Sequence, residues 1–195
     1  TLPVVNFSKE RLESTEFYPY KKLFKDGLAS VMVAHLQVPA LEPRENYPTS
    51  LSYNVVTTVL QKELGFKGLI FTDALNMKGA TNFKQPGDID LEALLAGNYI
   101  LLFAEDVPLA LEKICVAYQD SILTEERLEH SVKKILKYKY KVGLDHYHPI
   151  NTNNLYNDLN NLKNEALQYE LYENAITVIK NKNNILPIEK LENEK

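Results

Sequence analysis

Three short apolar runs alternate with segments of helical periodicity, and this alternation is the feature that most restricts how the chain can fold. The runs occupy residues 29–34, 68–72 and 99–103, and each has the length of a single strand. Strands separated by helices lie parallel within one sheet, and continuous apolar character suits strands that are covered on both faces. The sequence therefore predicts an α/β fold with three βα units.

The helices are predicted from capping residues and apolar stripes. Ser52, for example, precedes a stripe whose apolar residues recur at helical spacing until Gly65. We expect the first helix to be interrupted near Pro19, because proline lacks the N–H that a helix interior needs. The predicted helices span residues 8–26, 52–64, 90–96, 107–119, 125–142 and 160–174. A further apolar run at 175–180 is predicted to be a strand.

The composition argues against several classes of function. Of the 195 residues, 45% are hydrophobic and 25% charged, which is ordinary for a globular protein. The net charge of −4 argues against a nucleic-acid partner, because such proteins carry a basic surface. No apolar run approaches the roughly 20 residues of a membrane span. His146 and His148 lack a supporting cluster at ligand spacing, so we predict neither a metal nor a cofactor.

The composition changes after the last of these βα units. Residues 151–195 contain 12 asparagines, a residue type that favours turns over long regular elements. We therefore expect one domain over residues 1–144, a linker over 145–159, and the start of a second unit over 160–195. The chain begins without Met and without a charged and apolar leader, so we expect it to be processed, cut or incomplete.

Two polar residues stand where predicted strands end. Asp73 directly follows the run 68–72, and His35 follows the run 29–34. Functional groups of parallel α/β folds collect at the carboxyl ends of the strands. An aspartate there can equally cap the next turn or helix, and a histidine can simply pack at the edge of a core. Position alone leaves both roles open for both residues.

The ordered motifs of the chain resemble glycoside hydrolase family 3, in its β-N-acetylglucosaminidase branch. The matching segments are Val31–His35, Pro48–Ser52, Leu64–Gly68, Thr72–Met77, Ala93–Gly97 and Ile135–Leu144. Residues 175–187 resemble the first strand and turn of the family's second domain. The resemblance implies that residues 1–144 are the last three βα units of a partial (β/α)8 TIM barrel. The linker and the beginning of an α/β/α domain then follow.

The resemblance also implies an activity. The chain would belong to a retaining glycoside hydrolase that releases terminal β-linked N-acetylglucosamine through a covalent glycosyl-enzyme intermediate. Asp73 matches the family's nucleophile, and Ala74 stands where β-glucosidase members usually carry Trp. We place His35 at the mouth of the barrel near the sugar, and Met77 beside its N-acetyl group, with simple packing as the alternative for both. The substrate would be a carbohydrate, with peptidoglycan fragments as the family-based expectation.

Two family features are absent or altered. The acid/base of this branch resembles a His–Asp dyad within a Lys-His…His-Gly segment, and this sequence contains no such segment. The family's spacing puts that segment upstream of Thr1, so we expect the chain to work with the N-terminal part of the same barrel. Tyr99 stands where the family usually has Asp, a change expected to affect packing at the last strand. The family resemblance points to a bacterial cytoplasm, periplasm or cell envelope.

Several alternatives stay open. A β-glucosidase or β-xylosidase of the same family would use the same nucleophile, and a phosphorolytic variant would use phosphate in place of water. A sugar-binding scaffold and a phospho-receiver module are the alternatives without glycosidase activity. The receiver fold needs paired acids after its first strand and a lysine after its last. Here the first of these runs ends in His35, and residues 103–106 contain no lysine, so this alternative is disfavoured.

Overall fold

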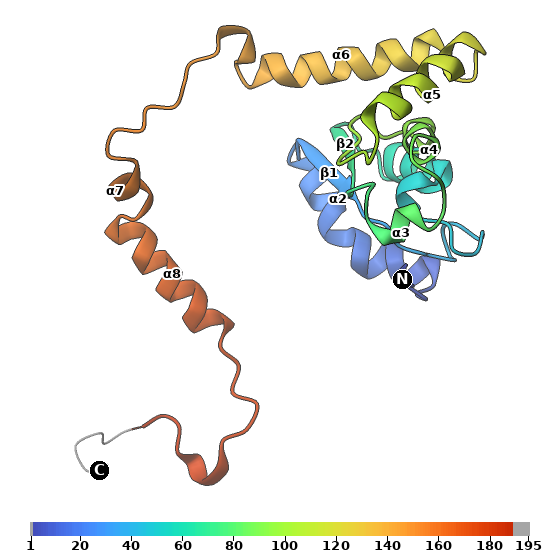
Figure 1. Cartoon of the computed structure of the whole chain (residues 1–195). Helices are drawn as coiled ribbons and strands as arrows, with labels where there is room; N and C mark the ends of the chain where they lie inside the picture. The colour runs from blue at the N-terminus through green and yellow to red at the C-terminus, as the bar shows by residue number, and fades with distance from the viewer. Residues whose placement is uncertain (1, 189–195) are drawn as a thin grey trace. The chain divides into compact units, whose positions relative to one another are not determined.

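The computed structural model describes residues 2–188. The chain divides into two compact units, Thr1–His146 and Tyr147–Lys195. The first unit contains the strands and all the predicted site residues, and Figure 1 traces it from blue to yellow. None of the helices formed by residues 2–188 combines the length and the apolar character needed to cross a membrane.

The sheet is parallel, as the alternation of runs and helices predicts. Strand β1 (Ser30–Val33) pairs with β2 (Leu69–Thr72) in register from Ser30↔Leu69 to Val33↔Thr72 (Figure 1). The third apolar run joins β2 through a single parallel bridge between Phe71 and Ile100. The predicted strand over 99–103 is therefore wrong in extent.

The side chain of Thr72 explains this early end. The backbone N–H of Tyr99 donates to Ile70 O at 2.9 Å, as a ladder would require. Two residues beyond the bridge, the N–H of Leu102 donates to Thr72 Oγ1 at 2.9 Å instead of to a strand carbonyl. Because a side chain occupies that place in the ladder, regular pairing stops there.

Strand β1 also departs from the prediction. It alternates between exposed and half-buried residues, and Met32 is 58% exposed. One face of β1 is thus open in residues 2–188, although its apolar run predicts cover on both faces. β2 agrees with the prediction, because three of its four residues are buried. Ile70 of β2 packs with Val56 and Ala96 in one core cluster, and Leu75 joins a second cluster directly after the strand.

The helices of the first unit follow the predicted order. In this unit η marks 3₁₀ or π turns, and the elements are α1 (Lys9–Arg11), η1 (Leu12–Glu16), α2 (Phe17–Lys25), η2 (Thr49–Leu51), η3 (Asn54–Glu63), α3 (Lys78–Thr81), α4 (Asp88–Ala96), α5 (Val107–Gln119), α6 (Glu125–Lys141) and η4 (Leu144–His146). Ser52 Oγ accepts the backbone N–H of Val55 at 3.1 Å, so it caps, as predicted, the helix that starts at Tyr53 and continues as η3. Asp106 and Thr124 cap α5 and α6 in the same way, at 3.0 and 3.2 Å.

The irregular turn of the N-terminal helix lies before the proline rather than at it. The wide π turn is η1, and Pro19 is part of the regular helix α2. A proline ring collides with the carbonyl four residues earlier, which here belongs to Thr15 in η1. The wider turn of η1 removes this collision, so the helix continues through the proline.

The second unit is helical in its described part. It contains α7 (Leu155–Leu159), α8 (Leu162–Ala175) and the short turn η5 (Lys182–Asn184), so the predicted helix over 160–174 is confirmed. The predicted strand over 175–180 is wrong, since Ala175 ends helix α8 and residues 176–180 form neither a helix nor a strand. An extended segment becomes a strand only with a neighbour to pair with, and the side chain of Ile179 is 96% exposed.

Candidate active site

Asp73 lies directly at the carboxyl end of β2. Its backbone N–H donates to Val33 O at 3.0 Å, so the last rung of the β1–β2 ladder fixes its main chain. Its carboxylate accepts the backbone N–H of Ala74 on Oδ1 at 2.8 Å. Asp73 is half-buried, and the residue at the N-cap of α3 is Met77. Asp73 therefore does not cap α3, which was one of the two roles that the sequence left open for it.

His35 lies at the carboxyl end of β1, inside the core. Its side chain is held among buried groups, and the residue is only 4% exposed. Its Nδ1 lies 2.6 Å from Ser50 Oγ, and its Nε2 lies 2.9 Å from Ala74 O. The structure thus brings His35 to the residue next to Asp73, with both ring nitrogens engaged within the protein.

Met77 shares the turn that follows Asp73. Its backbone N–H donates to Ala74 O at 3.0 Å, which closes a turn over residues 74–77. Its side chain is 47% exposed, so it is available to a ligand. Asp73 and Met77 therefore lie on one short loop after β2, and His35 contacts the same loop from the end of β1, through the carbonyl of Ala74.

Two further polar residues support this loop, and the sequence assigns no role to either. Ser50 is fully buried in η2 and meets the ring of His35. Asn98 is also fully buried, and its Nδ2 donates to Ser50 O at 2.8 Å and to Ala93 O at 2.7 Å. Ser50 belongs to the motif Pro48–Ser52, so its motif could have drawn attention to it. Nothing local to Asn98 indicates which carbonyls it will meet.

Tyr99 has a structural role at the start of the third run. It is buried, and burial raises the pKa of its hydroxyl. The hydroxyl donates a hydrogen bond to Gln61 Oε1 at 3.1 Å and accepts one from Lys134 Nζ at 3.2 Å. The residue that replaces the family's usual Asp thus packs between η3 and α6, as expected for a position that affects packing at the last strand.

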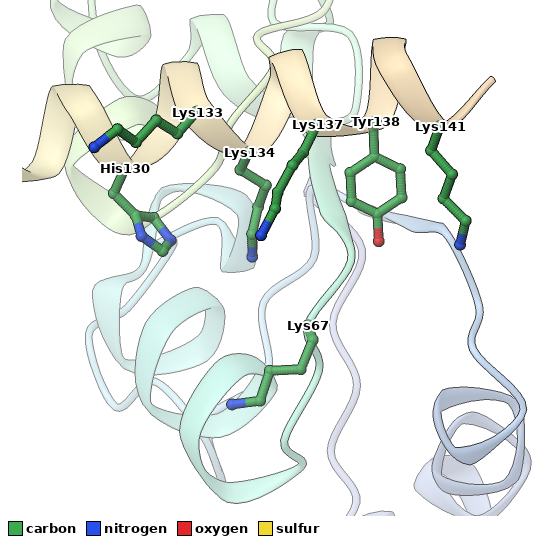
Figure 2. A pocket seen from close by; sticks show the side chains of 7 residues that line it. All are labelled: Lys67, His130, Lys133, Lys134, Lys137, Tyr138 and Lys141. Carbon is green, nitrogen blue, oxygen red and sulfur yellow. The ribbon is translucent and has the colours of Figure 1, made fainter. Parts of the chain in front are cut away.

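A hollow lined by lysines lies at the other end of β2. Lys67 lies two residues before the strand, and α6 crosses opposite it. Figure 2 shows Lys134, Lys137 and Tyr138 extending from α6 toward the segment that bears Lys67. The cavity measures about 590 Å³ and is lined by Lys67, His130, Lys133, Lys134, Lys137, Tyr138 and Lys141. None of the predicted site residues lines it.

The lysine-lined cavity has a distinct electrostatic character. Burial lowers the pKa of Lys134, and the charges of Lys67 and Arg127 lower it further. Burial likewise lowers the pKa of His130, as do Lys134 and Arg127. Groups of His, Cys, Asp and Glu that could hold a metal ion are absent from residues 2–188.

Parallel βα units with an acid at a strand's carboxyl end define an α/β protein, a class that includes the TIM barrel. Residues 1–138 match the model of the glycosyl hydrolase family 3 N terminal domain. The chain belongs to this family, as its ordered motifs predict, and the predicted fold class of a partial TIM barrel is confirmed.

Individual relatives agree with the family. Beta-hexosaminidase A of Pseudoalteromonas piscicida is 28% identical over 96% of this chain and 34% of its own length. A family 3 beta-N-acetylglucosaminidase from Paenibacillus sp. str. FPU-7 has a TM-score of 0.71 at 33% identity, over 77% of this chain and 29% of that one. Beta-glucoside phosphorylase BglX has a TM-score of 0.84 at 25% identity, over 96% of this chain and 35% of that one. The chain thus spans about a third of the length of the relatives it matches.

Proposed function

We propose that the protein containing this chain is a retaining glycoside hydrolase that releases terminal β-linked N-acetylglucosamine, with Asp73 as its nucleophile. The observation that carries the proposal is the position of Asp73. It is a half-buried carboxylate on the loop after a central parallel strand, oriented through Oδ1 by the N–H of Ala74. Relatives named beta-hexosaminidase and beta-N-acetylglucosaminidase support the choice of sugar.

The proposed reaction has two displacements. Asp73 Oδ2 accepts no hydrogen bond from residues 2–188, and we assign it as the attacking atom. It forms a bond to the anomeric carbon while the bond from that carbon to the leaving oxygen breaks, and an acid protonates the leaving oxygen. Water then attacks the same carbon, gives up a proton to the base and releases Asp73. The acid/base group belongs to the N-terminal part of the same barrel, which we propose as the partner of this chain.

The remaining assignments follow the same proposal. Residues 1–144 are the C-terminal part of the barrel domain, residues 145–159 are the linker, and residues 160–195 are the start of an α/β/α domain. The exposed side chain of Met77 lies on the Asp73 loop and suits contact with the N-acetyl group. The substrate we favour is a peptidoglycan-derived fragment.

The test is the Asp73→Asn substitution in the full-length protein. We expect kcat for an aryl β-N-acetylglucosaminide to fall by at least about 10³-fold, because the amide is a far weaker nucleophile. Asp120→Asn makes the same change at an exposed carboxylate and is expected to keep wild-type activity. A slow fluorosugar substrate should label the peptide that contains Asp73, as read by mass spectrometry. Turnover retained by Asp73→Asn would contradict the assignment.

A second candidate function is phosphorolysis or a different sugar within the same family. The match to a beta-glucoside phosphorylase favours testing it. The wild-type protein is incubated with aryl β-N-acetylglucosaminide, aryl β-glucoside and aryl β-xyloside, each with and without inorganic phosphate. Free N-acetylglucosamine as the main product supports the proposal. A sugar 1-phosphate, or a preference for glucoside or xyloside, would replace it.

A further inference from the structure

His35 meets the catalytic loop at the residue next to the proposed nucleophile. Its Nε2 lies 2.9 Å from the carbonyl oxygen of Ala74. A carbonyl oxygen can only accept, so Nε2 carries the proton and donates it. In the neutral ring, Nδ1 then accepts the hydroxyl proton of Ser50 at 2.6 Å. Neither nitrogen is left for a sugar hydroxyl, and the ring is buried.

Ala74 connects this histidine to the carboxylate. Its N–H donates to Asp73 Oδ1 at 2.8 Å, while its carbonyl accepts His35 Nε2. The same carbonyl accepts the N–H of Met77 at 3.0 Å. A rotation of residue 74 would therefore break the contact to His35, loosen the turn, and move the donor that orients Asp73.

The ring of His35 is itself fixed from behind. Thr49 Oγ1 donates to Ala34 O at 2.7 Å and accepts the N–H of Leu36 at 3.2 Å, so Thr49 clasps the backbone on both sides of His35. Ser50 is tied in turn to Asn98, whose Nδ2 donates to Ser50 O at 2.8 Å. Both ring nitrogens of His35 are paired, and a buried group with its hydrogen bonds made holds one arrangement, because leaving it unpaired is costly.

We propose that His35 is a positioning residue: with Ser50 behind it, it holds the peptide of Ala74 so that the carboxylate of Asp73 keeps its attacking orientation. This inference rests on the proposed function of Asp73 and replaces a role for His35 in binding the sugar. Orientation of a reacting group matters strongly, since a misplacement of about 1 Å can cost about 10²-fold in rate.

The experiment compares three variants in the full-length protein. His35→Leu removes the donor to Ala74, His35→Gln keeps an N–H donor, and Ser50→Ala removes only the support behind the ring. With an aryl β-N-acetylglucosaminide, we expect kcat to fall about 10²-fold for His35→Leu and about tenfold or less for the other two. We expect KM to stay within about threefold in all three, because ground-state binding is not removed. His148→Gln, an exposed change, is the control.

A sugar-binding role predicts the opposite split. If KM rises tenfold or more while kcat is kept, or if His35→Leu has wild-type kinetics, the proposal is overturned. Thermal unfolding by circular dichroism verifies that each variant is folded. Should His35→Leu not fold, the kinetics of His35→Gln and Ser50→Ala decide, since wild-type kcat in both would refute the positioning role.

A second readout separates this inference from the proposed function. Hydrogen exchange at the amide of Ala74, resolved with overlapping peptides, reports on the loop whether or not the protein cleaves a glycoside. We expect exchange there to be at least tenfold faster in His35→Leu, with the control unchanged. If the wild type cleaves no glycoside but exchange accelerates, the proposed function fails and the positioning contact stands. If the wild type is active and neither exchange nor kcat changes, the positioning role fails alone.

Discussion

The two ends of strand β2 differ in how their polar side chains are arranged. At the carboxyl end, Asp73, His35 and Ser50 are tied together through hydrogen bonds of 2.6 to 2.9 Å, two of them through Ala74. At the amino end, the lysine-lined cavity gathers like charges around a space of about 590 Å³. The first arrangement fixes each group in one direction. The second leaves its cations partly hydrated and repelling one another.

The cavity thus has the higher concentration of charge, whereas the carboxyl end has the side chains that short hydrogen bonds hold in place. The charged form of Lys134 is disfavoured at its position, because burial and the nearby Lys67 both lower its pKa. It is retained by packing, since its Nζ lies 4.5 Å from the centroid of the Tyr99 ring and also donates to the Tyr99 hydroxyl. The proposed function needs a carboxylate of fixed orientation, and at the carboxyl end of β2 the N–H of Ala74 orients Asp73.

The largest effect on stability is expected from a substitution at the carboxyl end of β2. Asn98→Ala removes the two donor bonds of a fully buried amide, so Ser50 O and Ala93 O lose a partner. We expect the free energy of unfolding to fall by about 2–3 kcal/mol in urea titration, and kcat to fall with it. Asn153→Ala changes an exposed asparagine and should shift neither quantity. Equal stability of the two variants would mean that the buried network does not hold this end.

A smaller effect is expected at Glu42, on the segment that connects β1 to η2. Arg44 Nε and Nη2 each donate to its carboxylate at 2.7 Å, and Ser52 Oγ donates at 2.6 Å. The hydrogen bonds from Arg44 lower the pKa of Glu42 to about 2, and burial opposes this. Above about pH 5, Glu42→Gln should lower the free energy of unfolding by about 1–3 kcal/mol. This range is smaller than the pKa shift alone would give, because the Arg44 side chain is half exposed and water screens the ion pair.

The pH dependence of this effect has a definite sign. The pKa of Glu42 is lower in the folded chain than in the unfolded one, so its contribution is present above the ordinary value of 4.5 and is lost as the pH falls toward about 2. The stabilities of wild type and Glu42→Gln should therefore converge in that interval in urea titrations. Glu45→Gln, an exposed change in the same segment, should follow the wild type throughout. A constant difference between wild type and Glu42→Gln at all pH values would contradict this account.

The smallest effect is expected at the amino end of β2, with the opposite sign. Lys67→Gln removes one of the charges that face Lys134, so at low salt the free energy of unfolding should rise by up to about 0.5 kcal/mol. The gain should fade in 0.5 M NaCl, because screening shortens the reach of the charges. Lys113→Gln removes a lysine paired to Asp88 at 2.9 Å and should instead lower stability slightly. Loss of stability in Lys67→Gln at low salt would contradict the repulsion.

Local signals predicted much of this fold. The caps at Ser52, Asp106 and Thr124 are contacts between residues three apart, and the parallel order follows from the alternation of runs and helices. The two wrong strand predictions concern segments whose structure depends on residues outside the segment itself. The third run leaves the ladder because of the hydroxyl of Thr72, and residues 175–180 are not a strand because a strand is made by its partner.

The candidate site divides along the same line. The sequence by itself determined the family, the parallel βα order and the place of Asp73 after β2, because hydrophobic period, capping and motif order are carried by neighbouring residues. Only the tertiary structure decided which groups His35 contacts. Its partners Ser50 and Ala74 lie 15 and 39 residues away, and no local pattern states which way the two nitrogens of a ring will point. Packing settles that direction, because a buried ring must find its partners wherever the folded chain brings them.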